Sequence, residues 1–273
     1  MDLKEKALPM IRDIVFAIAI VGLLLAVLWG YTGQFPHSPM VVVTSGSMMH
    51  DNAPFGRIGT IDPGDLVLVK KIHGKDDVIT RGPSYAPTTK HKTYGDYGDV
   101  IVYIPDRDGD GIADKDATPI IHRAICWVQV NSDGTYTVEE YNLYNVTSIT
   151  IAELGLSNYK PPHSGFITKG DHNPSADQAI RQGSLPAIST PVKPEWIIGK
   201  ARGEVPWFGL IKLVFFGDKN IQGEPGWIRI GKAVAPKDEW ICLGISLFIL
   251  IGIPTIWDAY KFYKKWKSEK LRL

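Results

Sequence analysis

Residues Ile120–Val130 read IIHRAICWVQV, a short run dominated by β-branched and aromatic side chains. Such residues favour strands, and turn-forming Gly, Pro, Asp or Asn often flank the similar runs that lie on both sides of this one. Those runs are Met40–Thr44, Leu66–Ile72, Val100–Ile104, Tyr136–Val138, Phe166–Lys169 and Trp196–Lys200. The pattern predicts a mostly β domain, built as a coiled sheet or a partly closed barrel. The polar stretch Lys75–Tyr97 is rich in Gly, Pro and Thr, which predicts a loop or insertion.

Two longer apolar segments, Ile14–Tyr31 and Trp240–Trp257, contain no charged residue. About 20 apolar residues span a bilayer as a helix, and the aromatic residues at both ends suit the membrane interface. The alternatives are a cleaved signal peptide at the first segment and a buried core helix at the second. The residues after Tyr31 offer no small-x-small cleavage site, so we expect a retained anchor.

Basic residues after Trp257 place this end of the chain in the cytoplasm by the positive-inside rule. Two spans then put the β region on the other side of the membrane. The expected organisation is a cytoplasmic N-terminus (1–13), a transmembrane helix (14–31), an extracytoplasmic β domain (32–239), a second transmembrane helix (240–257) and a basic cytoplasmic tail (258–273).

Charge and cysteine content exclude some classes of protein. The chain has 30 Lys and Arg against 29 Asp and Glu, so no overall field favours a nucleic-acid partner. Cys126 and Cys242 lie far apart in sequence and in different kinds of segment, so we expect no disulfide.

The apolar stretch Pro206–Phe216 is too short to span a bilayer. It is either a core strand or helix or a surface that dips into the membrane interface.

Ser45-Gly46-Ser47-Met48 follows a predicted strand and offers a candidate nucleophile. A serine hydroxyl attacks a carbonyl only when a positioned base takes its proton. The glycine allows an unusual turn, the N–H of Ser47 offers an oxyanion donor, and Ser45 Oγ offers a second. An ordinary Ser/Gly turn is the competing interpretation.

His122, in the central run, is a candidate base, although an isolated histidine among apolar residues is more often a core residue. Asp171 and Asp177 lie in the polar turn Gly170–Gln178 that follows another predicted strand. Either carboxylate could orient an imidazole, as the third member of a catalytic triad does. The alternative is a β-turn whose acids cap backbone amides.

The order of these motifs resembles the conserved boxes of type I signal peptidases. The matching segments follow an apolar anchor and are Ser45–Met48, Pro63–Val69, Gly98–Val100, His122–Arg123, Gly170–Gln178 and Gly199–Pro206 with Gly209. Bacterial members have lysine where this chain has His122, whereas archaeal and endoplasmic-reticulum members have histidine. The chain is therefore similar to the archaeal/ER branch.

The resemblance implies a role for each matched residue. Ser47 is the nucleophile, His122 its general base, and Asp177 the carboxylate that completes the relay. Ser45 matches the position linked to oxyanion stabilisation, and Asp171 the aspartate of the GD pair.

The chain departs from the family pattern in three places. His50 stands where proline is usual, His172 replaces the first asparagine of GDNN, and Ala176 replaces the first acid of the distal pair. His50 and His172 are therefore alternative bases.

The function implied by the resemblance is a membrane-bound serine endopeptidase that removes signal peptides from secreted preproteins, cleaving after small residues. Its expected partners are preproteins, the lipid bilayer and a nearby Sec translocon, and its chemistry requires no metal or organic cofactor. The alternatives are a processing protease related to the LexA-like regulators, which normally use lysine, and a non-catalytic membrane protein or accessory subunit of the same fold.

The acidic stretch Asp106–Asp116 matches the D-x-D-x-D-G start of a calcium-binding loop. Hard cations take oxygen ligands at alternate positions of such a loop, including a backbone carbonyl at the seventh. The expected ligands are Asp106, Asp108, Asp110, the Ile112 carbonyl and Asp114. The twelfth position is Ala117 instead of glutamate, and a solvated acidic hairpin turn is the alternative.

Overall fold

The computed structural model describes residues 3–180, 187–216 and 235–270. The chain divides into two units. The first comprises Met1–Val41 and Val67–Gly203, and the second comprises Val42–Leu66 and Glu204–Leu273. Most strands belong to the first unit.

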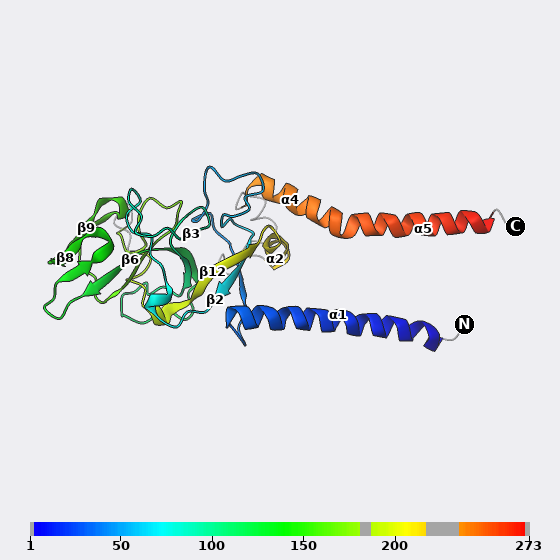
Figure 1. Ribbon diagram of the computed structural model, residues 1–273, viewed down its shortest axis with the longest axis horizontal. Helices are drawn as coiled ribbons and strands as arrows, with labels where there is room; N and C mark the ends of the chain where they lie inside the picture. The colour runs from blue at the N-terminus through cyan, green and yellow to red at the C-terminus, as the bar shows by residue number, and fades with distance from the viewer. Residues whose placement is uncertain (1–2, 181–186, 217–234, 271–273) are drawn as a thin grey trace. The chain divides into compact units, whose positions relative to one another are not determined.

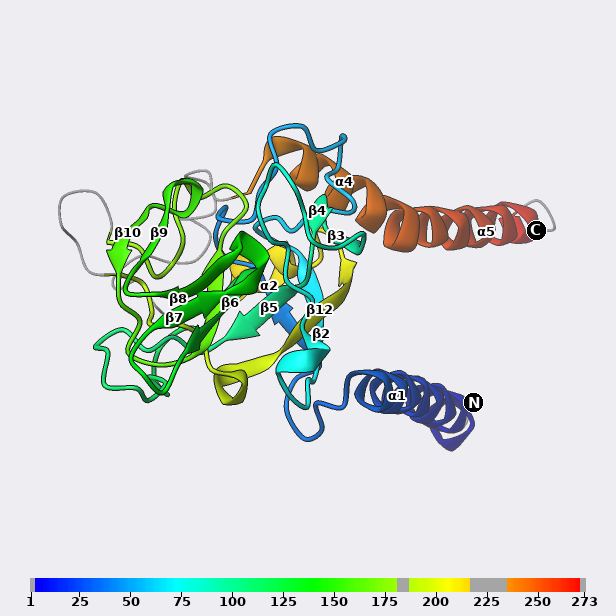
Figure 2. The same cartoon turned by 60° about the vertical axis from the view of Figure 1, so that its left-hand side comes forward.

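An antiparallel sheet forms the first unit, with β6 (Ile120–Val130) at its centre (Figures 1 and 2). β6 pairs antiparallel with β5 (Val100–Tyr103), β7 (Tyr136–Val138) and β11 (Gly165–Lys169). The full strand order adds β1 (Met40–Val42), β2 (Leu66–Lys70), β12 (Ile197–Val205) and β8 (Leu143–Val146) in the sequence β1-β2-β12-β5-β6-β7-β8, with β11 on β6. The sequence prediction of a mostly β fold is confirmed, and the sheet is not a closed barrel.

Smaller elements complete this unit. β9 (Ile149–Ile151) and β10 (Leu156–Tyr159) form one short hairpin, and β3 (Lys92–Thr93) and β4 (Asp96–Tyr97) form another. Single 3-10 turns are η1 (Lys75–Asp77), η2 (Glu139–Tyr141), η3 (Ala152–Leu154) and η4 (Pro194–Trp196). The predicted loop Lys75–Tyr97 therefore contains only the turn η1 and the two-residue strands β3 and β4.

A bulge in β6 decides which side chains share a face of the sheet. Ile167 and Thr168 of β11 pair with Cys126 and Ala124, so Ile125 is an extra residue on β6. An extra residue reverses the alternation of side chains beyond it. Accordingly Ala124 and Trp127 pack in one core cluster, whereas Ile125, Cys126 and Val128 pack in the other.

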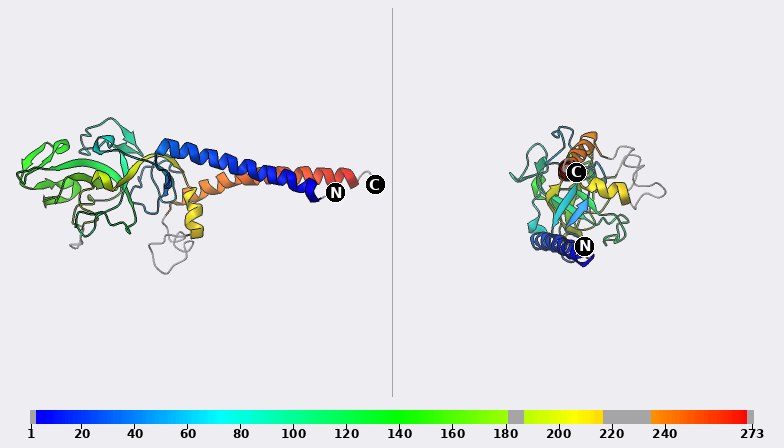
Figure 3. Two further views of the ribbon diagram at one scale, coloured as in Figure 1. Left: turned by 90° about the horizontal axis from the view of Figure 1, so that it is seen from below. Right: turned by 90° about the vertical axis from the view of Figure 1, so that its right-hand side faces the viewer.

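Two helices long and apolar enough to cross a membrane lie near the ends of the chain, as the sequence predicts. The first is part of α1 (Leu3–Thr32), and its apolar window, within Ile11–Thr32, is 0% buried. The second runs through α4 (Lys237–Leu247), η5 (Phe248–Gly252) and α5 (Ile253–Lys270), a continuous helical stretch in Figure 3. Its π turn, η5, ends at Gly252, two residues before Pro254. Proline has no N–H and its ring crowds the preceding turn, which accounts for the irregular hydrogen bonding at this point of the helix.

The short apolar stretch Pro206–Phe216 contains a helix, α2 (Gly209–Phe216), in the second unit. Leu210 and Leu213 are buried and pack with Leu243 of α4. The first residue of α2 is glycine, and a Cβ at that position would lie 2.5 Å from the Gly64 carbonyl oxygen, so a larger residue does not fit there. The core-helix interpretation thus holds for one face, while Phe215 on the other is 75% exposed.

Candidate catalytic site

His122 and Asp177 form a buried hydrogen-bonded pair in the first unit. His122 Nδ1 lies 2.7 Å from Asp177 Oδ2, and the two residues are 4% and 0% exposed. His122 lies on β6. The Asp177 N–H donates to the Thr168 carbonyl of neighbouring β11 at 2.8 Å, and this hydrogen bond holds the turn Gly170–Gln178 against the end of β11. When Nδ1 donates to a carboxylate, Nε2 is the basic nitrogen of the neutral ring. The pair therefore has the orientation that a general base requires.

Two further side chains hold the same carboxylate oxygen. The Tyr103 hydroxyl donates to Asp177 Oδ2 at 2.8 Å, and the Thr168 hydroxyl donates to it at 2.6 Å. Burial raises the pKa of Tyr103, so the phenol stays a neutral donor. Sequence reasoning missed both residues, because a tyrosine and a threonine inside strands look like ordinary β formers.

Asp171 lies elsewhere, in a bidentate pair with Arg123. Arg123 Nε and Nη2 bind the two Asp171 oxygens at 2.8 and 2.6 Å. The guanidinium is 0% exposed, and its Nη1 donates to the Tyr97 and Gly98 carbonyls at 3.1 Å each. Arg123 thus connects the turn Gly170–Gln178 to β6 and to the β3–β4 hairpin. The two acids that the sequence left undecided have different partners.

The Gly98–Val100 and Gly199–Pro206 boxes meet at Asp99. Its buried carboxylate accepts from Arg202 at 2.7 Å, the Ile79 N–H at 3.1 Å and Lys200 at 3.3 Å, and His91 lies 3.0 Å away. Burial raises the pKa of Asp99, but the Ile79 hydrogen bond and the two cations outweigh it and the net pKa is lowered. This carboxylate therefore joins β5 to β12 as a structural anion.

Ser45 and Ser47 belong to the second unit. Their hydroxyl oxygens lie 3.3 Å apart, Ser45 is exposed and Ser47 is half-buried. Met48 is 1% exposed and anchors the turn, while Val43 exchanges hydrogen bonds with Gly64 and Asp65 of the Pro63–Val69 box. The turn that presents Ser47 is therefore fixed by the residues on both sides of it.

The alternative bases differ in their surroundings. The His50 carbonyl accepts from Arg57 Nη2 at 2.7 Å, and His172 is exposed in the turn that carries Asp171. His122 lies 2.7 Å from the buried carboxylate of Asp177. That partner distinguishes it from an ordinary surface histidine.

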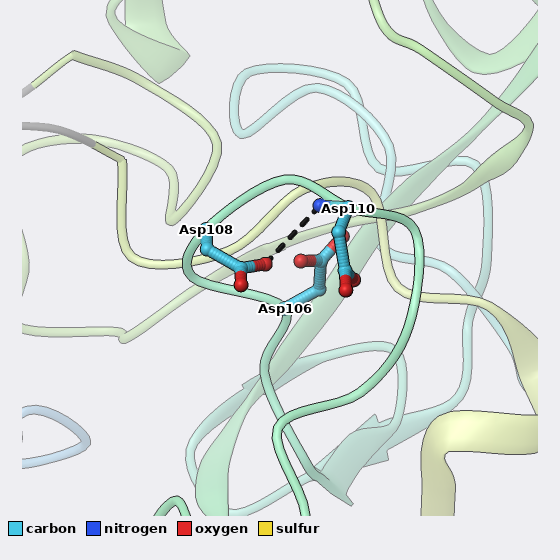
Figure 4. A group of neighbouring side chains, drawn as sticks. All are labelled: Asp106, Asp108 and Asp110. Atoms are coloured by element: carbon cyan, nitrogen blue, oxygen red, sulfur yellow. Dashed lines mark hydrogen bonds between the residues drawn. The ribbon is translucent and has the colours of Figure 1, made fainter.

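The acidic loop brings three of its predicted ligands together (Figure 4). Oxygens of Asp106, Asp108 and Asp110 lie within 4.8 Å of one another. Asp106 is 1% exposed and is fixed by the Gly109 and Gly111 N–H groups. Asp114 is outside the group of three, and its Oδ2 accepts the Arg107 N–H at 3.0 Å.

No protein-family model matches the chain, and no curated protein matches it.

Proposed function

We propose that the chain is a membrane-bound serine endopeptidase that removes signal peptides, of the archaeal/ER type I signal peptidase kind. The observation that carries the proposal is the buried His122–Asp177 pair, whose hydrogen bond is 2.7 Å long. The two long apolar helices support a membrane location. The basic tail supports cytoplasmic termini and an extracytoplasmic active site.

In the proposed reaction, Ser47 Oγ attacks the scissile carbonyl while His122 Nε2 takes its proton. The oxyanion is stabilised by the Ser47 N–H and Ser45 Oγ. Asp177 holds the imidazole and stabilises its protonated form, and His122 then gives the proton to the leaving amine. His122 next deprotonates a water molecule, which attacks the acyl-enzyme and restores Ser47. These steps use side chains, main-chain donors and water, with no metal or organic cofactor.

The membrane anchors fit the proposed substrate. A signal peptide carries an apolar segment that lies in the bilayer, so its cleavage site lies close to the membrane surface. An enzyme held by two membrane helices meets that bond without extracting the substrate. The resemblance to signal peptidases implies small residues at the substrate positions −1 and −3, and work beside the Sec translocon.

Cleavage of a model preprotein in detergent tests the function. We expect the wild-type chain to cut after a small residue, with the position read by mass spectrometry. The Ser47→Ala variant should bind the preprotein and leave it intact, because alanine has no nucleophile. A Ser38→Ala variant, which changes an exposed serine outside the site, serves as the matched control. An inert wild-type chain would favour a non-catalytic subunit.

A structural calcium ion is the second part of the proposal. Asp106, Asp108 and Asp110 supply the oxygen ligands that calcium prefers, and sites of this kind outside the cell bind at about 10⁻⁴–10⁻³ M. We expect isothermal titration of the full chain in detergent to show binding at millimolar calcium, and Asp108→Ala to lose it. Asp133→Asn, at a separate exposed turn, should retain it. Absence of heat in the wild-type chain would leave the loop as an acidic turn.

A further inference from the structure

A cavity of about 530 Å³ lies in the first unit, and neither Ser45 nor Ser47 is among the residues that line it. Four segments line it: η1 and the chain after it, the C-terminal part of β6 with Asn131, β7 with η2, and β11. Its residues include Lys75, Trp127, Gln129, Glu139, Glu140 and Phe166. The proposed reaction uses none of these side chains, so the cavity needs a separate explanation.

The cavity has an aromatic wall. Trp127 and Phe166, paired across β6 and β11, meet edge to face with ring centroids 4.9 Å apart. Lys75 Nζ lies 5.2 Å from the Trp127 centroid, and this lysine is exposed. The indole face of Trp127 thus already accommodates the ammonium group of Lys75. Because Lys75 is exposed, its side chain is able to move into solvent and leave this position to a ligand.

Glu140 supplies a fixed acceptor beside that wall. Its Oε1 accepts the Trp127 N–H at 3.0 Å and the Thr80 hydroxyl at 2.8 Å. Its Oε2 is buried and accepts no hydrogen bond from any residue that the structure describes. A buried carboxylate oxygen without a donor is costly, and a ligand that brings an N–H donor relieves that cost.

The charge of the lining favours a cationic ligand. Three carboxylates, those of Asp76, Glu139 and Glu140, face one ammonium, that of Lys75. An aromatic wall, a fixed carboxylate and net negative charge together match an ammonium or guanidinium group on an aliphatic stem.

The bulge in β6 places this cavity on the same face as His122. His122 pairs with Ile101, which shares a core cluster with Ala124, Phe166 and Trp127. His122 and Trp127 are five positions apart on β6, but the extra residue Ile125 leaves four ladder positions between them, and at about 3.3 Å per residue these span about 13 Å. An extended polypeptide that lies along β6 with its scissile bond at His122 reaches the cavity with about the fourth residue from that bond.

We propose that this cavity is a subsite for a lysine or arginine side chain of the substrate, about four residues beyond the scissile bond. The inference rests on the proposed function, which sets His122 at the cleaved bond. The chain before that bond leads back into the apolar segment in the bilayer, so we place the basic side chain in the mature part of the preprotein. The subsite thereby adds a preference downstream of the cut.

The test compares model preproteins that carry a single lysine at mature positions 3, 4 or 5 with versions carrying glutamine or glutamate there. We expect kcat/KM to be about tenfold higher for lysine than for glutamine at one of these positions, as a charge-assisted hydrogen bond allows. Glutamate should be worse than glutamine. Equal kcat/KM for the three residues at all positions would overturn the subsite while leaving the peptidase intact.

A protein variant assigns the effect to the cavity. Glu140→Gln keeps an oxygen for the Trp127 N–H and the Thr80 hydroxyl but removes the charge, so the lysine preference should fall to about twofold or less. Glu195→Gln, an exposed glutamate outside the lining, is the matched control and should keep the preference. An unchanged preference in Glu140→Gln would contradict the assignment, and the comparison of substrates with the wild-type chain stands even if this variant does not fold.

Binding without cleavage separates the two proposals. Fluorescence anisotropy of a labelled ten-residue peptide from the mature part, with lysine or glutamine at the preferred position, needs no catalysis. Lysine-dependent binding that Glu140→Gln removes, in a chain that cuts no preprotein, would support a basic side-chain site and refute the peptidase. Cleavage without lysine-dependent binding or processing would refute the site alone.

Discussion

His122→Ala should lower kcat/KM for a model preprotein by about 10⁶-fold, the loss seen when the base or nucleophile of a serine protease is removed. Without the imidazole, nothing in the proposed mechanism takes the Ser47 proton or protonates the leaving amine. The measurement is single-turnover cleavage with enzyme in excess, followed by gel and mass spectrometry. Thermal unfolding in the same detergent checks that the variant is folded.

Two comparisons make this result specific. His50→Ala and His172→Ala should each retain activity, because the 2.7 Å contact to a buried carboxylate belongs to His122. The double variant Ser47→Ala, His122→Ala should be no worse than either single variant, since the two residues act as one unit. Full activity in His122→Ala would move the base to His50 or His172 and refute the proposed mechanism.

Local sequence patterns were sufficient for the secondary structure around the site. Ile120–Val130 and Tyr136–Val138 are strands with the bounds that their β-branched and aromatic content predicts. The apolar helices near the termini follow equally from length and lack of charge. Such features depend on neighbours in sequence, so they are visible before the fold is known.

Contacts between distant segments could not be predicted in the same way. Tyr103 and Thr168 bind Asp177 only because β5 and β11 flank β6, which is a property of strand order. The bulge at Ile125, which sets the cavity and His122 on one face, leaves no mark in the sequence. Strand order and register determine these contacts, and neither follows from composition.

The calcium motif shows a different limit. Spacing predicted five ligands, and the structure groups the carboxylates of Asp106, Asp108 and Asp110. Asp114 lies outside that group and accepts the backbone N–H of Arg107. The spacing of a motif gives the order of its acidic residues but not which of their side chains the folded loop brings together.

Asp177 and Asp171 should separate catalysis from stability. Asp177→Asn replaces the acceptor of His122 Nδ1 by a group that can also donate, which disturbs the ring orientation. We expect kcat to fall by about 10⁴-fold, as for the equivalent change in a catalytic triad. KM should change little, because the carboxylate acts on the imidazole and makes no contact with substrate in the proposed mechanism.

Asp171→Ala should instead act mainly on folding. It leaves the Arg123 guanidinium, which is 0% exposed, without its bidentate partner. Loss of one member of a buried ion pair costs about 3–5 kcal/mol, which should appear as a lower denaturant midpoint. At a temperature where the variant is folded, activity per folded molecule should fall far less than in Asp177→Asn.

The matched control is Asp76→Ala, which removes an exposed carboxylate from η1 and should change neither the midpoint nor kcat for a substrate without a basic mature residue. The opposite pattern, with Asp171→Ala catalytically dead but stable and Asp177→Asn active, would exchange the roles of the two acids. It would then follow that the buried pair at 2.7 Å is a core contact and that His122 is not the base. Asp177→Asn and Asp171→Ala together test the catalytic assignment, because the proposed chemistry requires Asp177 and does not use Asp171.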